Sequence, residues 1–212
     1  MNLKDYIRSI PDYPKKGILF RDITTLIKDA NAFEECINQI IERSKNYKID
    51  KIAAIESRGF VFASAVSYLL KKPFILLRKK NKLPAETHSV DFELEYGTAT
   101  IEVHKDSIDK GDSVLIIDDL IATGGTAEAA AKLVEISGGK VASLVFAINL
   151  FDLGGSDALI KKGYKIENLM DFPGHWYLVP TLYDELFPIN EFIKPLTLEL
   201  YLLFIFSLKV IV

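Results

Sequence analysis

The sequence contains a single cysteine and no excess of charge of either sign. Cys36 cannot form an internal disulfide, which indicates a reducing compartment, and it falls on the apolar face of a predicted helix, so we expect it in the core. The chain has 26 Lys and Arg against 29 Asp and Glu, so no global basic field points to nucleic acid. No apolar run follows Met1, so we expect no secretory signal peptide and a cytoplasmic protein.

Long hydrophobic runs are also missing, and the nearest approach to one lies at the C-terminus. From Leu196 to Val212 every second residue is apolar, and this period of two favours β-structure. The uncharged stretch Leu200–Leu208 is far shorter than the roughly 20 residues needed to span a membrane, so we do not expect a membrane protein. Three alternatives stay open for residues 176–212: a packed or dimer-contact strand, a poorly ordered and aggregation-prone appendage, or a membrane anchor.

What the sequence does contain is an alternation of strand and helix patterns. A length of 212 residues fits one α/β domain. The predicted strands cover residues 51–55, 74–77, 98–103, 114–118, 141–149 and 166–170, and the predicted helices cover 31–45, 60–70, 127–136 and 156–162. This order is typical of a mainly parallel sheet with helices on both faces.

The most informative segment is residues 114–126, VLIIDDLIATGGT. Four apolar residues before Asp118 predict a strand covered on both faces. Asp118 and Asp119 then stand at its C-terminal end, where open α/β sheets bind their ligands. The run from Thr123 to Thr126 opens a helix, so free backbone N–H groups and two hydroxyls form an anion site suited to one phosphate.

This pattern resembles the phosphoribosyl pyrophosphate (PRPP) signature of the type I phosphoribosyltransferases. The resemblance implies that Asp118 and Asp119 hydrogen-bond the ribose 2′- and 3′-hydroxyls, with a catalytic role. It also implies that the ribose 5′-phosphate is wrapped by Ala122, Thr123, Gly124, Gly125 and Thr126. The implied fold class is α/β: a twisted, mainly parallel sheet with helices on both faces, plus a small N-terminal hood.

Two further segments resemble those of the adenine phosphoribosyltransferases within that family. The run Ser57-Arg58-Gly59-Phe60 is similar to their pyrophosphate-binding turn, which implies that Ser57 and Arg58 stabilise the leaving diphosphate. Residues 78–87 and 94–97 are similar to the R-K-x-x-K-L-P and L-E-Y-G segments that bracket the family's mobile catalytic loop. The twenty or so residues up to Thr98 carry little periodicity, which also favours a lid. By this resemblance Lys79 and Lys82 meet pyrophosphate oxygens, and Glu95 approaches N7 of the purine as acid or base.

Residues 11–24 contain Pro and Gly at several positions, so we expect neither an ordinary strand nor a helix there. The segment resembles the P-x-x-P-x-x-G-x-x-F-R-D-I hood of the adenine phosphoribosyltransferases. The resemblance implies that Phe20 stacks on adenine, that the Leu19 carbonyl accepts from the 6-amino group, and that the Arg21 N–H donates to N1.

The resemblance implies the reaction of adenine with PRPP to give AMP and pyrophosphate. Mg²⁺ would be held mainly through PRPP oxygens, with no dedicated protein metal site. We expect a homodimer with one phosphoribosyltransferase domain, residues 1–175 with the hood in 1–30, followed by an atypical apolar extension, 176–212. Two rivals remain: a xanthine or hypoxanthine-guanine phosphoribosyltransferase, and a PRPP-binding regulator, which would need a DNA-binding domain or a basic face.

Overall fold

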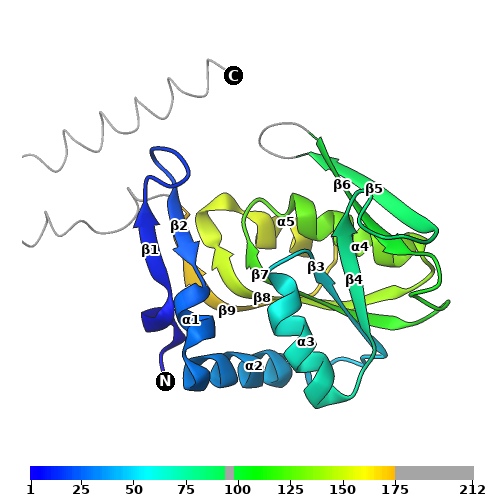
Figure 1. Ribbon diagram of the computed structural model, residues 1–212, viewed down its shortest axis with the longest axis horizontal. Coiled ribbons are helices and arrows are strands. Elements are labelled where there is room, and N and C mark those ends of the chain that lie inside the picture. Colours follow the sequence, from blue (N-terminus) through cyan, green and yellow to red (C-terminus); the bar gives the residue numbers. More distant parts are fainter. Residues whose placement is uncertain (94–97, 175–212) are drawn as a thin grey trace, which may run out of the picture. The chain divides into compact units, whose positions relative to one another are not determined.

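A mainly parallel sheet forms the centre of the structure, a computed structural model in which residues 1–93 and 98–174 are described (Figure 1). All of these residues belong to one unit, Met1–His175. In spatial order the strands of this sheet are β5 (Thr87–Glu93), β6 (Thr98–His104), β4 (Phe74–Lys79), β3 (Lys51–Ile55), β7 (Ser113–Ile121), β8 (Lys140–Leu150) and β9 (Ile166–Phe172). The helical elements are η1 (Leu3–Tyr6), α1 (Thr24–Lys28), α2 (Ala30–Ser44), α3 (Gly59–Leu70), α4 (Gly125–Ile136), η2 (Phe151–Leu153) and α5 (Gly155–Lys161).

The order of the strands creates a switch point between β3 and β7. β3 pairs in parallel with both β4 and β7, and β7 pairs in parallel with β8. From β3 the chain passes through α3 to β4 on one side, whereas from β7 it passes through α4 to β8 on the other. Open α/β sheets bind ligands at such a point, outside the carboxyl ends of the strands. The ends of β3 and β7 are therefore where the topology places a site.

Apolar side chains fill both sides of the sheet. Leu115 and Ile117 of β7 pack with residues of α2 and α3, and Val114 and Ile116 pack with residues of α4 and α5. All four are fully buried, which confirms the prediction of a strand covered on both faces. Cys36 lies in the cluster with α2, where burial raises the pKa of its thiol to about 12, so its expected place in the core is also confirmed.

The N-terminal segment is more regular than the sequence predicted. β1 (Arg8–Pro11) and β2 (Leu19–Asp22) pair antiparallel, with Ile10 opposite Phe20. The prediction of an irregular arm was wrong for residues 19–22. These residues form a strand because β1 supplies the backbone hydrogen-bond partners, which the local content of Pro and Gly does not reveal. Pro14 and Gly17 occupy the connection between the strands, where Gly17 has a φ of +90° and the Tyr13–Pro14 peptide bond is cis, while Pro11 is the last residue of β1.

Two other predictions need correction. β7 does not end at Asp118 but continues to Ile121, because β8 pairs with it that far, Ile121 opposite Asn149. The acidic pair therefore lies inside the strand. The stretch before Thr98, predicted as an aperiodic lid, contains β5, which pairs antiparallel with β6 and places Val90 opposite Ile101. A hairpin partner supplies the order that periodicity alone did not reveal.

Within residues 1–93 and 98–174, no helix combines the length and the apolar character needed to cross a membrane. The alternating segment 196–212 lies outside the described residues, so its three alternatives stay open.

Candidate functional site

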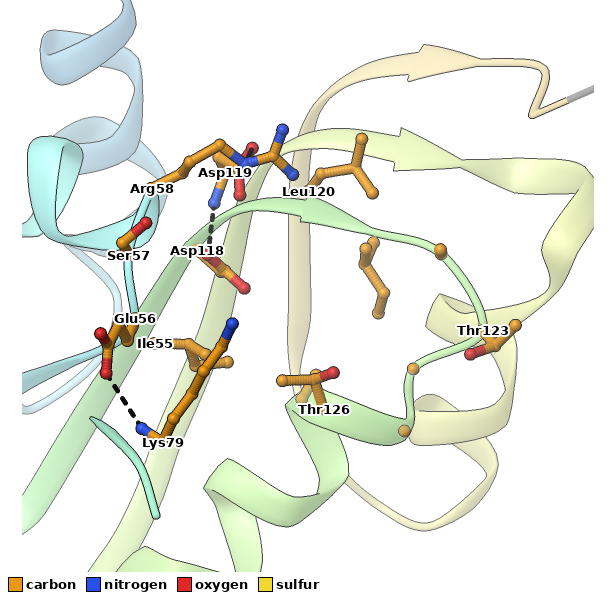
Figure 2. Close-up of a pocket in the computed structure, with 15 residues that line it drawn as sticks. Ile55, Glu56, Ser57, Arg58, Lys79, Asp118, Asp119, Leu120, Thr123 and Thr126 are labelled. Atoms are coloured by element: carbon orange, nitrogen blue, oxygen red, sulfur yellow. Dashed lines mark hydrogen bonds and ion pairs between the residues drawn. The ribbon is translucent and has the colours of Figure 1, made fainter. Parts of the chain in front are cut away.

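A cavity of about 400 Å³ opens at the switch point between β3 and β7 (Figure 2). Its walls come from three places: the turn after β3, the end of β4, and the end of β7 with the start of α4. The predicted site residues that line it are Ser57, Arg58, Lys79, Asp118, Asp119, Ala122, Thr123, Gly124, Gly125 and Thr126. Parallel strands present their carboxyl ends at one edge, which is why segments so far apart in the chain meet here.

The two neighbouring carboxylates on β7, Asp118 and Asp119, affect each other's ionisation. The Asp119 N–H donates to Asp118 Oδ1 at 2.9 Å, and Asp119 is buried. Burial raises the pKa of both carboxyls, and for Asp118 the neighbouring carboxylate raises it further. The pair therefore favours a ligand that donates hydrogen bonds or carries positive charge.

Arg58 connects this pair to the N-terminal hairpin. Its Nε lies 3.0 Å from Asp119 Oδ2, an ion pair whose alignment does not make a hydrogen bond. In Figure 2 the guanidinium extends over Asp119 at the rim of the cavity. The same guanidinium lies 5.9 Å from the centre of the Phe20 ring, so β2 reaches the neighbourhood of the cavity. Tyr13 meets Phe20 edge to face, with ring centres 5.1 Å apart.

Glu56 is a lining residue that the sequence analysis did not identify as a site residue. Its carboxylate accepts from Arg78 Nε and Nη2, each at 3.2 Å, and from the Lys79 N–H at 3.0 Å. These bonds, with that from Arg78 the largest cause, lower the pKa of Glu56. These hydrogen bonds of Glu56, which we call the Glu56 clamp, hold the end of β4 against the turn after β3. Figure 2 shows the Lys79 side chain extending from the end of β4 into the cavity. Glu56 directly follows β3, and this position at the carboxyl end of a strand is the feature of the sequence that could have identified it as a site residue.

The close packing around the turn at residues 122–126 explains its glycines. Gly124 has a φ of +88°, a conformation that L-residues rarely adopt, and a Cβ there would lie 3.1 Å from Gly155 Cα. Gly59, at the start of α3, is needed for space: a Cβ would lie 2.7 Å from Asp118 Oδ1. Both glycines keep backbone close to the cavity, where α4 begins and its first N–H groups are free for an anion.

The hairpin is fastened beside the site by backbone and side-chain bonds. The Leu19 N–H donates to the Gly174 carbonyl at 3.2 Å, and Arg21 Nη2 donates to the Pro173 carbonyl at 2.7 Å. The Arg21 guanidinium lies 4.5 Å from the centre of the Phe172 ring, and burial lowers its pKa. The Arg21 side chain is therefore structural, which leaves only its backbone for recognition.

Among the predicted site residues that the structure describes, Leu19, Phe20, Arg21 and Lys82 do not line the cavity. Lys82 is exposed and does not line it, although its carbonyl accepts from Arg78 Nη1 at 3.1 Å. Glu95 lies outside the described residues. Across the described ranges, no group of three or more His, Cys, Asp or Glu side chains is arranged to hold a metal ion.

Comparison with known proteins agrees with this geometry. Residues 24–176 match the family model of the phosphoribosyl transferase domain. The adenine phosphoribosyltransferase of Pelagibacter ubique is 93% identical over 175 residues, which cover 82% of this chain and all of that relative. The chain belongs to the adenine phosphoribosyltransferases.

Solved structures of adenine phosphoribosyltransferases share the fold. The enzyme from Thermoanaerobacter pseudethanolicus is 49% identical, with a TM-score of 0.77 over 80% of this chain and 98% of that one. The Saccharomyces cerevisiae enzyme, solved with an imino-altritol bisphosphate and adenine, is 34% identical, with a TM-score of 0.74 over 79% of this chain and 96% of that one. The predictions of family and of a type I phosphoribosyltransferase fold are therefore confirmed.

The raised pKa values of the acidic pair predict a cost in stability. A carboxyl whose pKa is higher in the folded than in the unfolded chain destabilises the fold as the pH rises above its ordinary value, and the full cost is present above the raised value. We expect Asp118→Asn to be more stable than the wild type at pH 7 by about 1 kcal/mol, the size common for stabilising substitutions. The gain should vanish below the ordinary pKa of an aspartate, where both chains are uncharged at this position.

Urea denaturation at pH 7 and at acidic pH measures this difference. Asp157→Asn, which removes an exposed carboxylate on α5, serves as the control. A lower stability of Asp118→Asn at pH 7 would contradict the prediction that the charged form of Asp118 destabilises the folded protein.

Proposed function

We propose that this cavity binds PRPP and that the enzyme transfers the 5-phosphoribosyl group to N9 of adenine, giving AMP and pyrophosphate. The observation that carries the proposal is the meeting of three features at one switch point: the acidic pair, the glycine turn, and Arg58 with the aromatic ring of β2 beside it. The complex of the yeast relative with adenine and a bisphosphate supports the same pair of ligands.

Each part of the cavity suits one part of PRPP. The turn from Ala122 to Thr126 binds the 5′-phosphate through backbone N–H groups and hydroxyls. Asp118 and Asp119 accept hydrogen bonds from the ribose hydroxyls, which relieves the repulsion between them. Ser57, Arg58 and Lys79 face the diphosphate, whose charge grows as it leaves. Two residues complete the proposed set: Lys82, which follows β4, and Glu95, which follows β5 and acts on N7 of adenine.

The free edge of β2 supports the choice of base. The Leu19 N–H points away from β1, toward Gly174. Since peptide groups two residues apart face the same side of a strand, the Leu19 carbonyl and the Arg21 N–H also face this outer edge. An acceptor followed by a donor matches the 6-amino group and N1 of adenine, while Phe20 supplies a surface for stacking.

The acidic pair also fits the Mg²⁺ that accompanies PRPP. Asp119 Oδ2 is buried without a hydrogen bond, and burial raises the pKa values of both carboxyls, so a further cation beside the pair would stabilise their charged forms even with Arg58 nearby. Asp118 and Asp119 would contribute to holding the ion, with most ligands coming from PRPP oxygens. When bound, Mg²⁺ neutralises charge on the diphosphate. The residues of the chain align the C1′ carbon with adenine N9 and keep the two substrates in contact.

We also propose that the enzyme is a cytoplasmic homodimer. The helix α3 exposes Tyr68 and Leu69, with 82% and 53% of their surfaces accessible, and the exposed Val61 lies about two turns earlier. Apolar side chains gathered on one helix are typical of a subunit interface. Sedimentation of the full chain measures its oligomeric state.

Formation of AMP tests the proposed reaction directly. The full chain is incubated with Mg²⁺, PRPP and adenine, and both AMP and pyrophosphate are measured. Equal amounts of the two products are expected. Absence of AMP from a folded preparation would refute the function.

Replacing Phe20 with alanine should weaken adenine binding and spare PRPP. Loss of aromatic stacking costs about 1 to 3 kcal/mol, which corresponds to a rise in the KM for adenine of roughly 5- to 150-fold. Steady-state kinetics measure this KM, and calorimetry measures the affinity for PRPP. Tyr13→Ala, which removes a ring packed T-shaped against Phe20 with ring centres 5.1 Å apart, is the control and should have a smaller effect. An unchanged KM for adenine in Phe20→Ala would place the base elsewhere.

A chain ending at His175 should keep the whole activity. Every residue proposed for binding or catalysis precedes that point, and the family match ends at residue 176. We expect unchanged kinetic constants and less aggregation than in the full chain, because the alternating apolar segment is removed. Loss of both folding and activity would show that residues 176–212 complete the core.

A further inference from the structure

Residues 152–155 connect β8 with α5, and we call them the 152–155 corner. This corner contacts the proposed phosphate-binding turn. The Gly155 N–H donates to the Ala122 carbonyl at 3.0 Å. A Cβ on Gly155 would lie 2.3 Å from that carbonyl oxygen and 2.6 Å from the Gly124 nitrogen. Gly155 does not have a positive φ, so its requirement for glycine is one of space and not of backbone conformation.

The corner is fixed on its other side by buried polar side chains. Ser156, the next residue, donates its hydroxyl hydrogen bond to Asn149 Oδ1 of β8 at 3.0 Å. Asn168 Nδ2 of β9 donates to the same hydroxyl at 3.1 Å. Ser156 is 6% exposed, and a network of this kind in a low-dielectric interior holds one geometry. The start of α5 therefore cannot shift without breaking bonds to both strands.

The same corner also supports the N-terminal hairpin. Asp152 Oδ1 accepts from the Gly174 N–H at 2.6 Å, and the Gly174 carbonyl accepts from the Leu19 N–H. A Cβ on Gly174 would lie 3.0 Å from Leu153 Cδ1, so this part of the backbone rests on the corner. The chain of contacts from Asp152 through Gly174 ends on Leu19, at the edge of β2 that faces adenine in the proposed function.

We propose that the 152–155 corner is a shared support that sets the position of the PRPP site relative to the adenine site. Gly155 positions the phosphate-binding turn, and Asp152 positions the hairpin edge through Gly174. Both are positioning residues, because each acts through another residue. The proposal rests on the proposed function for the assignment of the turn to PRPP and of the hairpin to adenine. It predicts that damage at the two ends of one short corner affects two different substrates.

Gly155→Ala tests the first end. The added methyl must displace the turn, and misplacement of this kind lowers affinity strongly, so we expect the dissociation constant of PRPP to rise about tenfold or more. The KM for adenine at saturating PRPP should stay within about twofold, because the atoms nearest to the added methyl belong to Ala122, Thr123 and Gly124 of the turn. Calorimetry with PRPP and Mg²⁺ and steady-state kinetics give the two values.

Gly154→Ala is the matched control. Gly154 has a φ of +71°, so alanine strains the backbone there, but a Cβ would meet no atom within 4 Å. We expect this variant to lose stability and to keep its affinity for PRPP. If Gly155→Ala does not fold, Ser156→Ala removes the fixed side of the corner without adding an atom, and the same loss of PRPP affinity is expected.

Asp152→Ala tests the second end. Loss of the bond to the Gly174 N–H frees the segment that holds Leu19, so we expect the KM for adenine to rise about fivefold to tenfold, the size expected for the net contribution of one ordinary hydrogen bond. The affinity for PRPP should stay unchanged. Asp152→Asn keeps an oxygen that can accept this bond and should restore most of the loss, whereas Asp157→Ala removes an exposed carboxylate of α5 and should have no effect.

The split between substrates decides the proposal. Equal changes for both substrates in each variant, or Gly155→Ala with unchanged PRPP affinity, would overturn the shared support. Failure of the wild type to form AMP would instead refute the proposed function, so the two failures are distinguishable.

Discussion

Gly124→Ala is expected to weaken PRPP binding by about two orders of magnitude while the protein stays folded. Gly124 combines a φ of +88° with contact to Gly155, so a methyl group cannot be accommodated without moving the turn. The backbone N–H groups that would hold the 5′-phosphate then lose their common direction. Calorimetric titration with PRPP in the presence of Mg²⁺ measures the loss.

Gly138→Ala separates this effect from simple destabilisation. Gly138 follows the other end of α4 with a φ of +92°, and a Cβ there would meet Lys110 Cα at 3.5 Å, an ordinary contact. Both variants should lose about 1 to 2 kcal/mol of stability from the left-handed backbone, but only Gly124→Ala should lose PRPP affinity. Equal affinity for PRPP in the two variants would contradict the assignment of this turn to the PRPP site.

Hypoxanthine should be a poor substrate of the wild-type enzyme, with kcat/KM at least about 10³-fold below that for adenine. The physical reason is the edge of β2: a 6-oxo group would face the Leu19 carbonyl, leaving two acceptors opposed, and its protonated N1 would face the Arg21 N–H. Sites that read a polar group by hydrogen bonding reject an analogue with the wrong pattern by large factors. Initial rates with each base at saturating PRPP measure the ratio.

The recognition is assigned to backbone, so side-chain changes supply the control. Leu19→Val alters a buried side chain but keeps the carbonyl, and the preference for adenine should persist. Comparable kcat/KM values for adenine and hypoxanthine in the wild type would refute this reading of the base, and the PRPP site would be unaffected.

The local motifs were predictable because short-range geometry produces them. The order of apolar strand, acidic pair and glycine turn in residues 114–126 indicates a strand that runs into the N-terminus of a helix, and the structure contains this arrangement in β7 and α4. The ends of elements were less certain. β7 extends past the acidic pair because β8 pairs with it, and β5 exists because β6 lies beside it, so pairing partners decided what periodicity could not.

By itself the sequence determined which residue types stand at the ends of β3, β4 and β7, since the βαβ order brings these ends to one edge and fixes the chemistry there. Only the tertiary structure decided how these groups are held. The clamp of Glu56 on Arg78 joins residues that are 22 positions apart, and the contact of Gly155 with Ala122 depends on where α5 returns to the sheet. The hairpin is fastened to residues 173–174 from the other end of the described chain. Such contacts have no local sequence pattern, because they depend on side chains and backbone that become neighbours only after the sheet has formed.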